Sequence, residues 1–327
     1  MRIPPPQHLS PVETIGVDLG GSNLRVAVVD GDRNVLYRST ESSSGDSAED
    51  ILSNLGEELE KALATCPGVA AAGLGIPCTI NQEAGVAITA VNLPLIDVPI
   101  RELMRERLGL PVFIDNDVNT AILAEHRYGA ARGVRNAVML TLGTGIGGAI
   151  LLGGAVYRGT HGAGSELGHM VVDLDGPPCQ GNCPNRGCIE ALASGTALAR
   201  EGRAAAEREP ESMLAATVAD DGEVSGETVT EAALAGDEAA GEVLAMVGRR
   251  LGAAFSSLAN IFEPEVIVVG GGVMAAGELL LEPARRELRA RALPPMNGAR
   301  VAAAELGDDA GMIGAATMAR LELGEGG

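Results

Sequence analysis

Short apolar runs and longer amphipathic segments follow one another along the chain. Between Thr14 and Thr40, β-rich runs are separated by the polar turns Gly20-Gly21-Ser22-Asn23 and Asp30-Gly31-Asp32. Short strands broken by glycine-rich turns are typical of hairpins, so the pattern predicts an antiparallel meander at the start of the chain.

Helices and buried strands alternate after the meander. Ser47 and Asp50 stand in capping-box positions before a helix that we predict over about Ala48 to Ala64. We also predict strands over residues 69–76 and 112–115 and a helix around residues 100–108. Asp117 or Asn119 is placed to cap the helix that follows.

The pattern then begins a second time. A predicted strand over residues 136–142, a glycine turn over 143–148 and a returning strand over 149–157 repeat the first strand–turn–strand unit. Two such units predict a duplicated α/β fold with a cleft between its halves. The second half continues with mainly helical sequence over 195–262, a polar loop over 207–226, strands at 265–269 and 300–305, and a last helix over 311–323.

The uncharged run from Ala137 to Tyr157 is long enough to span a bilayer. Glycines and threonines interrupt it throughout, which favours buried strands over a membrane helix. The first residues, MRIPPPQHLSPVE, lack the apolar core of a signal peptide, so we expect a cytoplasmic protein without a membrane partner.

Composition narrows the possible functions. The 327 residues are enough for two cores, and the net charge of -20 argues against a nucleic-acid partner, because phosphate recognition needs clustered Lys and Arg. With three Phe, three Tyr and no Trp, the core must consist of aliphatic side chains.

A histidine and three cysteines lie close together in the sequence: His169, Cys179, Cys183 and Cys188. Three thiolates and an imidazole are a typical ligand set for tetrahedral zinc. A disulfide between two of these cysteines would leave the third thiol unpaired and give His169 no role. The reducing compartment expected for this protein also favours a metal site over a disulfide. The sequence therefore predicts a zinc site, whereas Cys66 and Cys78 are expected to be core thiols.

Three glycine turns are candidates for nucleotide binding, because glycine lets backbone N–H groups approach phosphate closely. The first contains Asp18, Gly20, Gly21, Ser22 and Asn23, although an ordinary β-turn is the alternative. The second contains Gly143, Thr144 and Gly145; it matches G-x-G-x-x-G, but a strand follows where a dinucleotide site needs a helix. The third, Gly271 and Gly272, follows a buried strand and suits an adenine or ribose.

Asp117 follows a buried strand at the junction of the two halves. Phosphoryl transfer to an alcohol needs a carboxylate that accepts the hydroxyl proton. Asp117 is the candidate for this role, with helix capping as the structural alternative.

These features together resemble the ROK family of sugar kinases and repressors, within the actin-like ATPase superfamily, over about residues 13–320. The most specific part is the run GAGSELGH from Gly162 to His169, followed by the cysteines and by Gly187-Cys188-Ile189-Glu190. The usual family pattern C-x-C-G-x-x-G-C-x-E is changed here to a wider Cys179–Cys183 spacing with Pro184 after the second cysteine.

The resemblance implies a fold and a domain division. We expect the duplicated actin-like ATPase (ribonuclease H-like) fold, with a small α/β domain over residues 1–117 plus about 303–327. A large α/β domain over 118–302 would carry the zinc loop. The family also implies ATP, Mg²⁺ and a structural zinc ion, and a homodimer or homotetramer.

The resemblance also implies roles for individual residues. Asp117 would be the catalytic base that takes the proton of the sugar 6-hydroxyl. The implied sugar-binding residues are Gly75, Asn92, Asn116, Asp117, Glu166, His169 and Glu190. The implied nucleotide-binding residues are Asp18, Gly20, Gly21, Ser22, Asn23, Gly143, Thr144, Gly145, Gly271 and Gly272. The implied zinc ligands are His169, Cys179, Cys183 and Cys188.

The implied activity is ATP-dependent phosphorylation of a hexose at the 6-hydroxyl, with D-glucose as the expected substrate. An N-acylhexosamine, such as N-acetylmannosamine or N-acetylglucosamine, and fructose are the alternatives within the enzyme class. The alternative outside it is a sugar-responsive repressor. It is disfavoured because such proteins carry a DNA-binding domain ahead of the sugar-binding part, whereas the first glycine turn here begins at Asp18.

Overall fold

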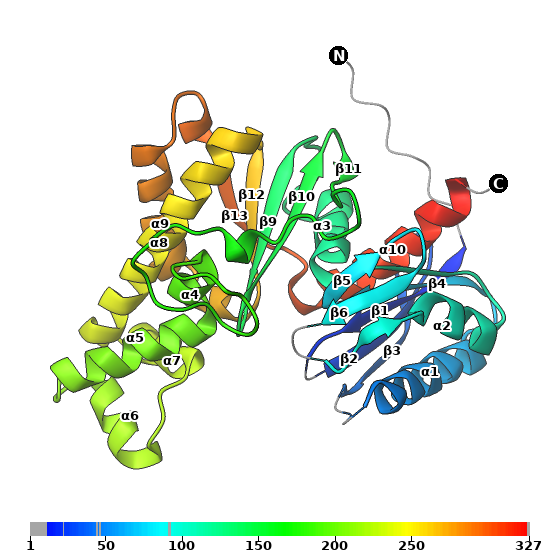
Figure 1. Ribbon diagram of the computed structural model, residues 1–327, viewed down its shortest axis with the longest axis horizontal. Helices are drawn as coiled ribbons and strands as arrows, with labels where there is room; N and C mark the ends of the chain where they lie inside the picture. The colour runs from blue at the N-terminus through cyan, green and yellow to red at the C-terminus, as the bar shows by residue number, and fades with distance from the viewer. Residues whose placement is uncertain (1–11, 22, 44, 46, 91–92, 326–327) are drawn as a thin grey trace. The chain divides into compact units, whose positions relative to one another are not determined.

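The computed structural model describes residues 12–21, 23–43, 45, 47–90 and 93–325 (Figure 1). The chain divides into two compact units. Unit 1 consists of Met1–Arg135, Ala155–Ser165 and Glu305–Gly327, and unit 2 consists of Asn136–Gly154 and Glu166–Ala304. The chain therefore crosses from one unit to the other several times.

Unit 1 is built on a five-stranded sheet in the order β3-β2-β1-β4-β8. β1 (Glu13–Leu19), β2 (Asn23–Val29) and β3 (Val35–Ser42) form the antiparallel meander that the sequence predicts. β4 (Val69–Ile76) and β8 (Val112–Asn116) lie parallel to β1. The carboxyl ends of these parallel strands carry Asp18, Gly75 and Asn116, which brings three predicted site residues to one edge of the sheet.

The α-helices in the described residues of unit 1 are α1 (Ala48–Thr65), α2 (Ile100–Leu108), α3 (Asp117–Tyr128) and α10 (Ala310–Glu325). The Ser47 hydroxyl accepts a hydrogen bond from the Asp50 N–H and so caps α1, as predicted. The buried side chains of α1 and α2 are largely apolar. They pack with the interior side chains of β1, β4 and β8 in one core.

A small antiparallel sheet in unit 1 was not predicted. It consists of β5 (Cys78–Asn81), β6 (Val86–Ala90) and β7 (Ile96–Val98). Its strands are short and only partly buried, so their sequences lack the long apolar runs that mark the other strands.

Unit 2 repeats the plan of unit 1. β9 (Ala137–Leu142) and β10 (Ile146–Leu152) form an antiparallel hairpin, while β12 (Val266–Gly270) and β13 (Arg300–Ala303) extend the sheet in parallel, in the order β10-β9-β12-β13. The short strand β11 (Ala155–Val156) follows in the chain. The predicted repeat of strand, glycine turn and strand is therefore confirmed, although the turn is shorter than the predicted 143–148.

The core of unit 2 lies under a set of helices. They are α4 (Ile189–Ala193), α5 (Gly195–Arg208), α6 (Met213–Asp221), α7 (Gly226–Leu234), α8 (Glu238–Phe262) and α9 (Glu278–Arg291). The expectation of a polar loop over 207–226 was wrong in its middle, because Ser212 caps α6 through the Ala215 N–H and starts a helix there. The 3₁₀ segments of the chain are Leu167–His169, Gly272–Ala276, Met296–Gly298 and Gly307–Asp309.

The units do not divide where the sequence places the domain boundaries, at 117 and about 302. In the structure α3 stays with unit 1, because its residues pack along α10 and a Cβ on Gly314 would collide with the Thr120 carbonyl oxygen. The first crossing therefore comes after Arg135 instead of after Asp117. No helix in the described parts of the chain is long and apolar enough to cross a membrane.

Candidate functional site

The first glycine turn joins β1 to β2 and is closed by the Gly20 N–H, which donates to the Asn23 carbonyl at 2.8 Å. Asp18 precedes it and lies 3.3 Å from Arg25 across the hairpin. Burial raises the pKa of Asp18, and the neighbouring Arg25 opposes that shift. The start of α10 crowds the same carboxyl, because a Cβ on Gly311 would lie 2.5 Å from Asp18 Cγ.

Ser22 of this turn and Asn92 of the expected sugar site lie outside the described residues. Their predicted roles therefore stay predictions. Asn23 is the exposed first residue of β2, and Gly21 is also exposed.

The end of β8 presents Asn116 and Asp117 together. Asn116 is the N-cap of α3, and its Oδ1 accepts from the Val118 N–H at 3.0 Å and from the Asn119 N–H at 3.4 Å. The sequence analysis placed this cap on Asp117 or Asn119. That prediction was wrong, because the N-cap is Asn116, one residue before Asp117. Asp117 is instead the first residue of the helix, where the exposed N–H groups of the first turn stabilise a carboxylate.

Gly75, at the end of β4, lies directly against this helix start. A Cβ there would lie 2.7 Å from Thr120 Oγ1 and 3.4 Å from Asp117 Cα. The glycine therefore lets the strand end approach the residue that is predicted to act as the base. Cys78 lies nearby, and burial raises the pKa of its thiol to about 12, with a further contribution from the charge of Asp117.

Asp115 is a residue of this region that the sequence reasoning missed. Its side chain is only 3% exposed, and its Oδ1 accepts hydrogen bonds from Gln82 Nε2, Asn119 Nδ2 and the Asn116 N–H. Its Oδ2 accepts from Arg158 Nε at 2.7 Å. A charged group at the end of an otherwise apolar strand was the available signal, since buried carboxylates are rare unless they are paired.

In unit 2, residues of α4 and α5 hold the second glycine turn by hydrogen bonds. The Glu190 Oε2 accepts the Ile146 N–H at 2.8 Å, and a Cβ on Gly145 would lie 2.5 Å from that oxygen. The Gly195 N–H donates to the Gly143 carbonyl at 2.7 Å. The turn is thus fixed by its neighbours, and glycine is required at Gly145 for the close approach.

The Thr144 carbonyl is also held by hydrogen bonds. It accepts hydrogen bonds from Thr196 Oγ1 at 2.9 Å and from Gln180 Nε2 at 3.3 Å. Gln180 also donates to Ser194 Oγ. These three supporting side chains were not predicted, because they come from segments that only the fold brings beside the turn.

The third turn lies beside the second. Gly271 follows β12 with φ +88°, and a Cβ there would lie 2.5 Å from the Leu142 carbonyl at the end of β9. A Cβ on Gly272 would meet no described atom within 4 Å. The chain is therefore close to β9 at Gly271 and open at Gly272, which leaves backbone accessible to a flat ligand.

The predicted zinc ligands come together in unit 2. One ligand atom each from His169, Cys179, Cys183 and Cys188 lies within 4.8 Å of all the others. The His169 Nδ1 and the Cys179 Sγ are 3.5 Å apart, and the sulfurs of Cys183 and Cys188 are 3.9 Å apart.

These distances can be compared with a tetrahedral zinc site. With Zn–S bonds of about 2.3 Å and Zn–N bonds of about 2.0 Å, two sulfurs should lie about 3.8 Å apart and a sulfur and a nitrogen about 3.5 Å apart. The His169–Cys179 and Cys183–Cys188 pairs therefore match a zinc site despite the wide Cys179–Cys183 spacing, and the remaining ligand atoms lie within 4.8 Å. Burial raises the pKa of the Cys179 and Cys188 thiols, and a bound cation would reverse this by favouring the thiolates.

Glu190 connects this cluster to the second glycine turn. Its Oε2 holds the Ile146 N–H, while its Oε1 is the acceptor for the Cys179 thiol at 3.7 Å. Glu166 lies at the surface near both His169 and Glu190. Surrounding protein atoms nevertheless raise the pKa of its carboxyl; His169 opposes this shift and the Glu190 charge adds to it. Unit 2 thus groups all three of its predicted sugar-binding residues.

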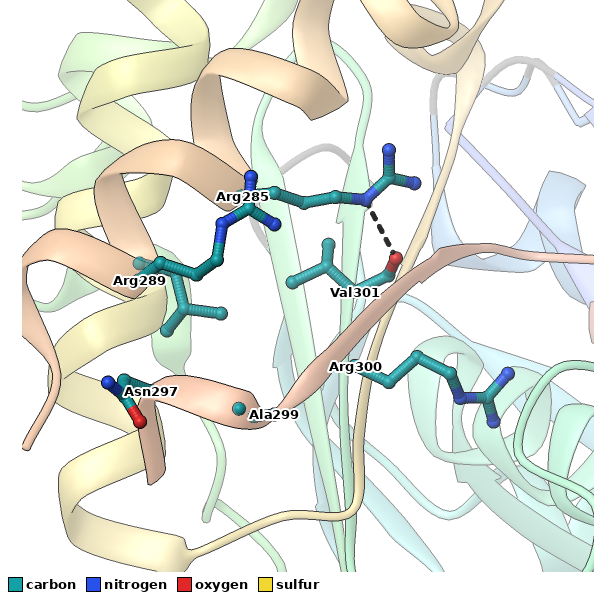
Figure 2. Close-up of a pocket in the computed structure, with 8 residues that line it drawn as sticks. Arg285, Arg289, Asn297, Ala299, Arg300 and Val301 are labelled. Atoms are coloured by element: carbon teal, nitrogen blue, oxygen red, sulfur yellow. Dashed lines mark hydrogen bonds between the residues drawn. The ribbon is translucent and has the colours of Figure 1, made fainter. Parts of the chain in front are cut away.

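Figure 2 shows a hollow elsewhere in unit 2, of about 200 Å³, between α9 and the start of β13. It is lined by Arg285, Arg289 and Arg300 among others. Arg285 Nε donates to the Val301 carbonyl at 3.1 Å, and Arg289 pairs with Glu282. The hollow contains none of the predicted site residues, and its arginines already have partners.

Comparison with known proteins gives relatives over nearly the whole chain. A glucokinase of Halalkalibacterium halodurans is 36% identical over 307 residues, which cover 92% of this chain and 92% of the relative. A glucokinase of Thermotoga maritima is 35% identical over 318 residues, covering 96% and 99%.

Solved structures agree with this result. The ROK family glucokinase of Streptomyces griseus, in complex with glucose and AMPPNP, is 34% identical with a TM-score of 0.82, covering 94% of this chain and 99% of that one. A ROK family transcriptional regulator, a homologue of the Escherichia coli MLC protein, is 29% identical with a TM-score of 0.86, covering 96% and 79%. The duplicated sheets and these relatives confirm the predicted actin-like ATPase fold. Since the family profile also matches residues 14–322, the chain belongs to the ROK family.

Proposed function

We propose that the protein transfers the γ-phosphoryl group of ATP to the 6-hydroxyl of a hexose, with D-glucose as the preferred acceptor. The observation that carries the proposal is the similarity, at 34–36% identity over nearly full length, to glucokinases. One glucokinase at 34% identity was solved with glucose and an ATP analogue bound. The arrangement of the candidate residues within each unit agrees with this activity.

Unit 1 supplies the base and part of the sugar site. Asp117 accepts the proton of the 6-hydroxyl as the phosphoryl group leaves ATP, which needs a carboxylate and no covalent intermediate. The N-cap uses the Oδ1 of Asn116, so its Nδ2 amide is the part that can donate to a sugar hydroxyl. Gly75 and Asn92 complete this side of the sugar in the proposal.

Unit 2 supplies the remaining groups. Glu166, His169 and Glu190 bind sugar hydroxyls, because carboxylates accept hydrogen bonds from hydroxyl groups and the Nε2–H of the imidazole can donate one. Thr144 and Gly145 offer backbone N–H groups to the phosphates, as do Gly21, Ser22 and Asn23 of unit 1. Gly143 and Gly20 use their N–H groups to close the two turns. Gly271 and Gly272 lie against the adenosine.

Two metals belong to the proposal. Zinc, held by His169 Nδ1 and the three cysteine sulfurs, has four protein ligands and therefore a structural role. It fixes the imidazole so that Nε2 remains for the sugar. Mg²⁺ would accompany ATP and neutralise phosphate charge, and Asp18 is the carboxylate of unit 1 that would bind its water ligands.

The test is a coupled assay of ADP release with ATP, Mg²⁺ and a panel of acceptors. The panel contains glucose, mannose, fructose, N-acetylglucosamine and N-acetylmannosamine. We expect the highest kcat/KM with glucose. A higher value with an N-acylhexosamine would assign the other acceptor class. Sugar-induced thermal stabilisation without ADP release from any acceptor would favour a regulator of the same family.

The assignment of the base is tested with Asp117→Asn. We expect kcat to fall by about 100-fold or more, because a general base typically contributes that much. Sugar-induced stabilisation should remain, since the amide keeps the size of the side chain. The control is Asp97→Asn, an exposed aspartate in unit 1, which should keep normal turnover. Near-normal turnover of Asp117→Asn would exclude Asp117 as the base.

A further inference from the structure

Asp115, two residues before Asp117, is a buried carboxylate whose ion pair with the partly exposed Arg158 is used by none of the roles above. Asp115 is 3% exposed and Arg158 is 33% exposed, with 2.7 Å between Oδ2 and Nε. The other oxygen of Asp115 is already saturated by Gln82, Asn119 and the Asn116 N–H. The Oδ2 atom is therefore committed to Arg158.

Arg158 belongs to the segment Ala155–Ser165, which is the part of unit 1 that leads directly into Glu166. The segment is a closed loop, because the Gly164 N–H donates to the Arg158 carbonyl at 2.9 Å and Ser165 Oγ donates to the Tyr157 carbonyl at 3.2 Å. Fixing Arg158 therefore fixes both ends of the loop.

Two further features fix the path of this loop. A Cβ on Gly162 would collide with the Ile80 carbonyl of β5, so the loop lies against the small sheet. Ser165 has φ +73°, a conformation that costs free energy for a residue with a side chain and persists only where the surroundings impose it. The backbone of unit 1 is therefore constrained as far as Ser165, the residue before Glu166.

We propose that Arg158, held by Asp115, is a positioning residue for the sugar site, deepening the function proposed above, on which this inference rests. On one side, Asp115 holds the backbone N–H of Asn116 beside Asp117. On the other side, the same carboxylate anchors the loop that ends at Glu166. One buried carboxylate thus orders two segments of unit 1, the start of α3 at Asp117 and the loop that precedes Glu166 in the chain, and the ordering is completed before the sugar binds.

Asp115→Asn isolates the ion pair. The amide oxygen can keep the three donors that face Oδ1, whereas its NH₂ group would then face the guanidinium, which has no acceptor. Arg158→Met removes the charge and keeps much of the length of the side chain. We expect each variant to raise KM for the hexose by about tenfold or more. The kcat and the KM for ATP should stay within about twofold, because the lost interaction stabilises the bound sugar equally in the ground state and in the transition state.

The matched control is Arg107→Met. Arg107 also lies in unit 1, has 30% exposure against 33% for Arg158, and pairs with Glu60 at 2.7 Å on the helix surface. It should leave both KM values unchanged. The double variant Asp115→Asn/Arg158→Met should be no worse than either single variant, since both remove the same interaction.

A second measurement does not depend on turnover. Hydrogen exchange of peptides that cover residues 155–165 should accelerate in Arg158→Met and not in Arg107→Met. If the wild type phosphorylates no hexose, the proposed function fails, and exchange still tests the anchoring. If the wild type is active and Arg158→Met keeps both its hexose KM and its exchange protection, the positioning role is excluded.

Discussion

At the scale of single residues, two carboxylates at strand ends of unit 1 differ in how they are stabilised. Asp115 is surrounded by donors on both oxygens, as a buried charge requires. Asp18 has Arg25 as its partner, at the longer distance of 3.3 Å, and burial raises its pKa. Ionised Asp18 therefore costs folding free energy, which is typical of groups kept for a ligand.

This cost predicts a pH dependence. Because the pKa of Asp18 is raised in the folded state, its stabilising contribution is present in acid and is lost as the pH rises through that pKa. We expect Asp18→Asn to gain stability relative to the wild type as the pH rises from about 4 to 7. Urea unfolding at each pH measures the difference.

Asp30 gives a control of opposite sign. The hydrogen bond from the Asn34 side chain is the main reason why the pKa of Asp30 is lowered. The stabilising contribution of ionised Asp30 is therefore lost as the pH falls. Asp30→Asn should therefore lose stability relative to the wild type over the same rise in pH. If both variants shift in the same direction, burial is not what sets the behaviour of Asp18.

At the scale of elements, α10 shows how glycine allows close packing. Cβ atoms on Gly16 of β1 and Gly73 of β4 would collide with the backbone of α10, and one on Gly314 of α10 would collide with the Thr120 carbonyl of α3. The helix therefore contacts a sheet and another helix at backbone distance. These contacts position the start of α3 and with it Asp117.

Gly314→Ala tests this packing. We expect a loss of about 1–3 kcal/mol in the free energy of unfolding, because the backbone of α3 must move to admit the methyl group. Gly324→Ala, in the same helix, is the control. A Cβ there meets no described atom within 4 Å, so alanine should be neutral or stabilise by up to about 1 kcal/mol through helix propensity. Equal effects of the two substitutions would mean that the close contact is not what matters.

The elements also show what the sequence could predict. The 69–76 strand and the 100–108 helix were predicted with their observed bounds, because long apolar runs and amphipathic periodicity are local signals. β5, β6 and β7 were not predicted, because the small sheet is too short for a clear period. The turn at Gly270–Gly272 predicts that a helix follows, but gives no bounds for α9. Pro283 lies within α9, where proline normally argues against a helix.

The same limit applies to the site. The glycine turns and the zinc ligands could be predicted, because their chemistry is visible in short stretches of sequence. The pair of Asp115 and Arg158 joins residues 43 positions apart through an unpredicted sheet and loop. Similarly, the support of Thr144 by Gln180 and Thr196 depends on how unit 2 folds. Such contacts are tertiary and leave no local pattern.

At the scale of the whole molecule, the chain has separate hydrophobic cores in its two units. One core consists of residues between Ile15 and Ile114, and the other of residues between Val138 and Val301. The predicted zinc site lies only in unit 2. A perturbation of the metal should therefore act first on one core.

We expect about one tightly bound zinc ion per chain by metal analysis. Removal by a chelator should accelerate hydrogen exchange in residues 166–194 and in the turn 143–146, since Glu190 holds the turn and its Oε1 lies 3.7 Å from the sulfur of Cys179. Exchange in β1 and β4 should change less. Cys66→Ala, which removes a buried thiol from unit 1, serves as a control with unchanged zinc content. Absence of zinc together with freely reactive thiols throughout would contradict the assignment.

The position of Glu190 between two loops also affects how the protein can evolve. Its two carboxylate oxygens serve different loops, one at the cysteines and one at the glycine turn. A substitution at this position therefore disturbs both loops at once, and a single repair elsewhere restores only one of them. If both residues bind the sugar as proposed, mutational paths that alter acceptor choice are thus more accessible through Glu166, which is exposed, than through Glu190, which is buried.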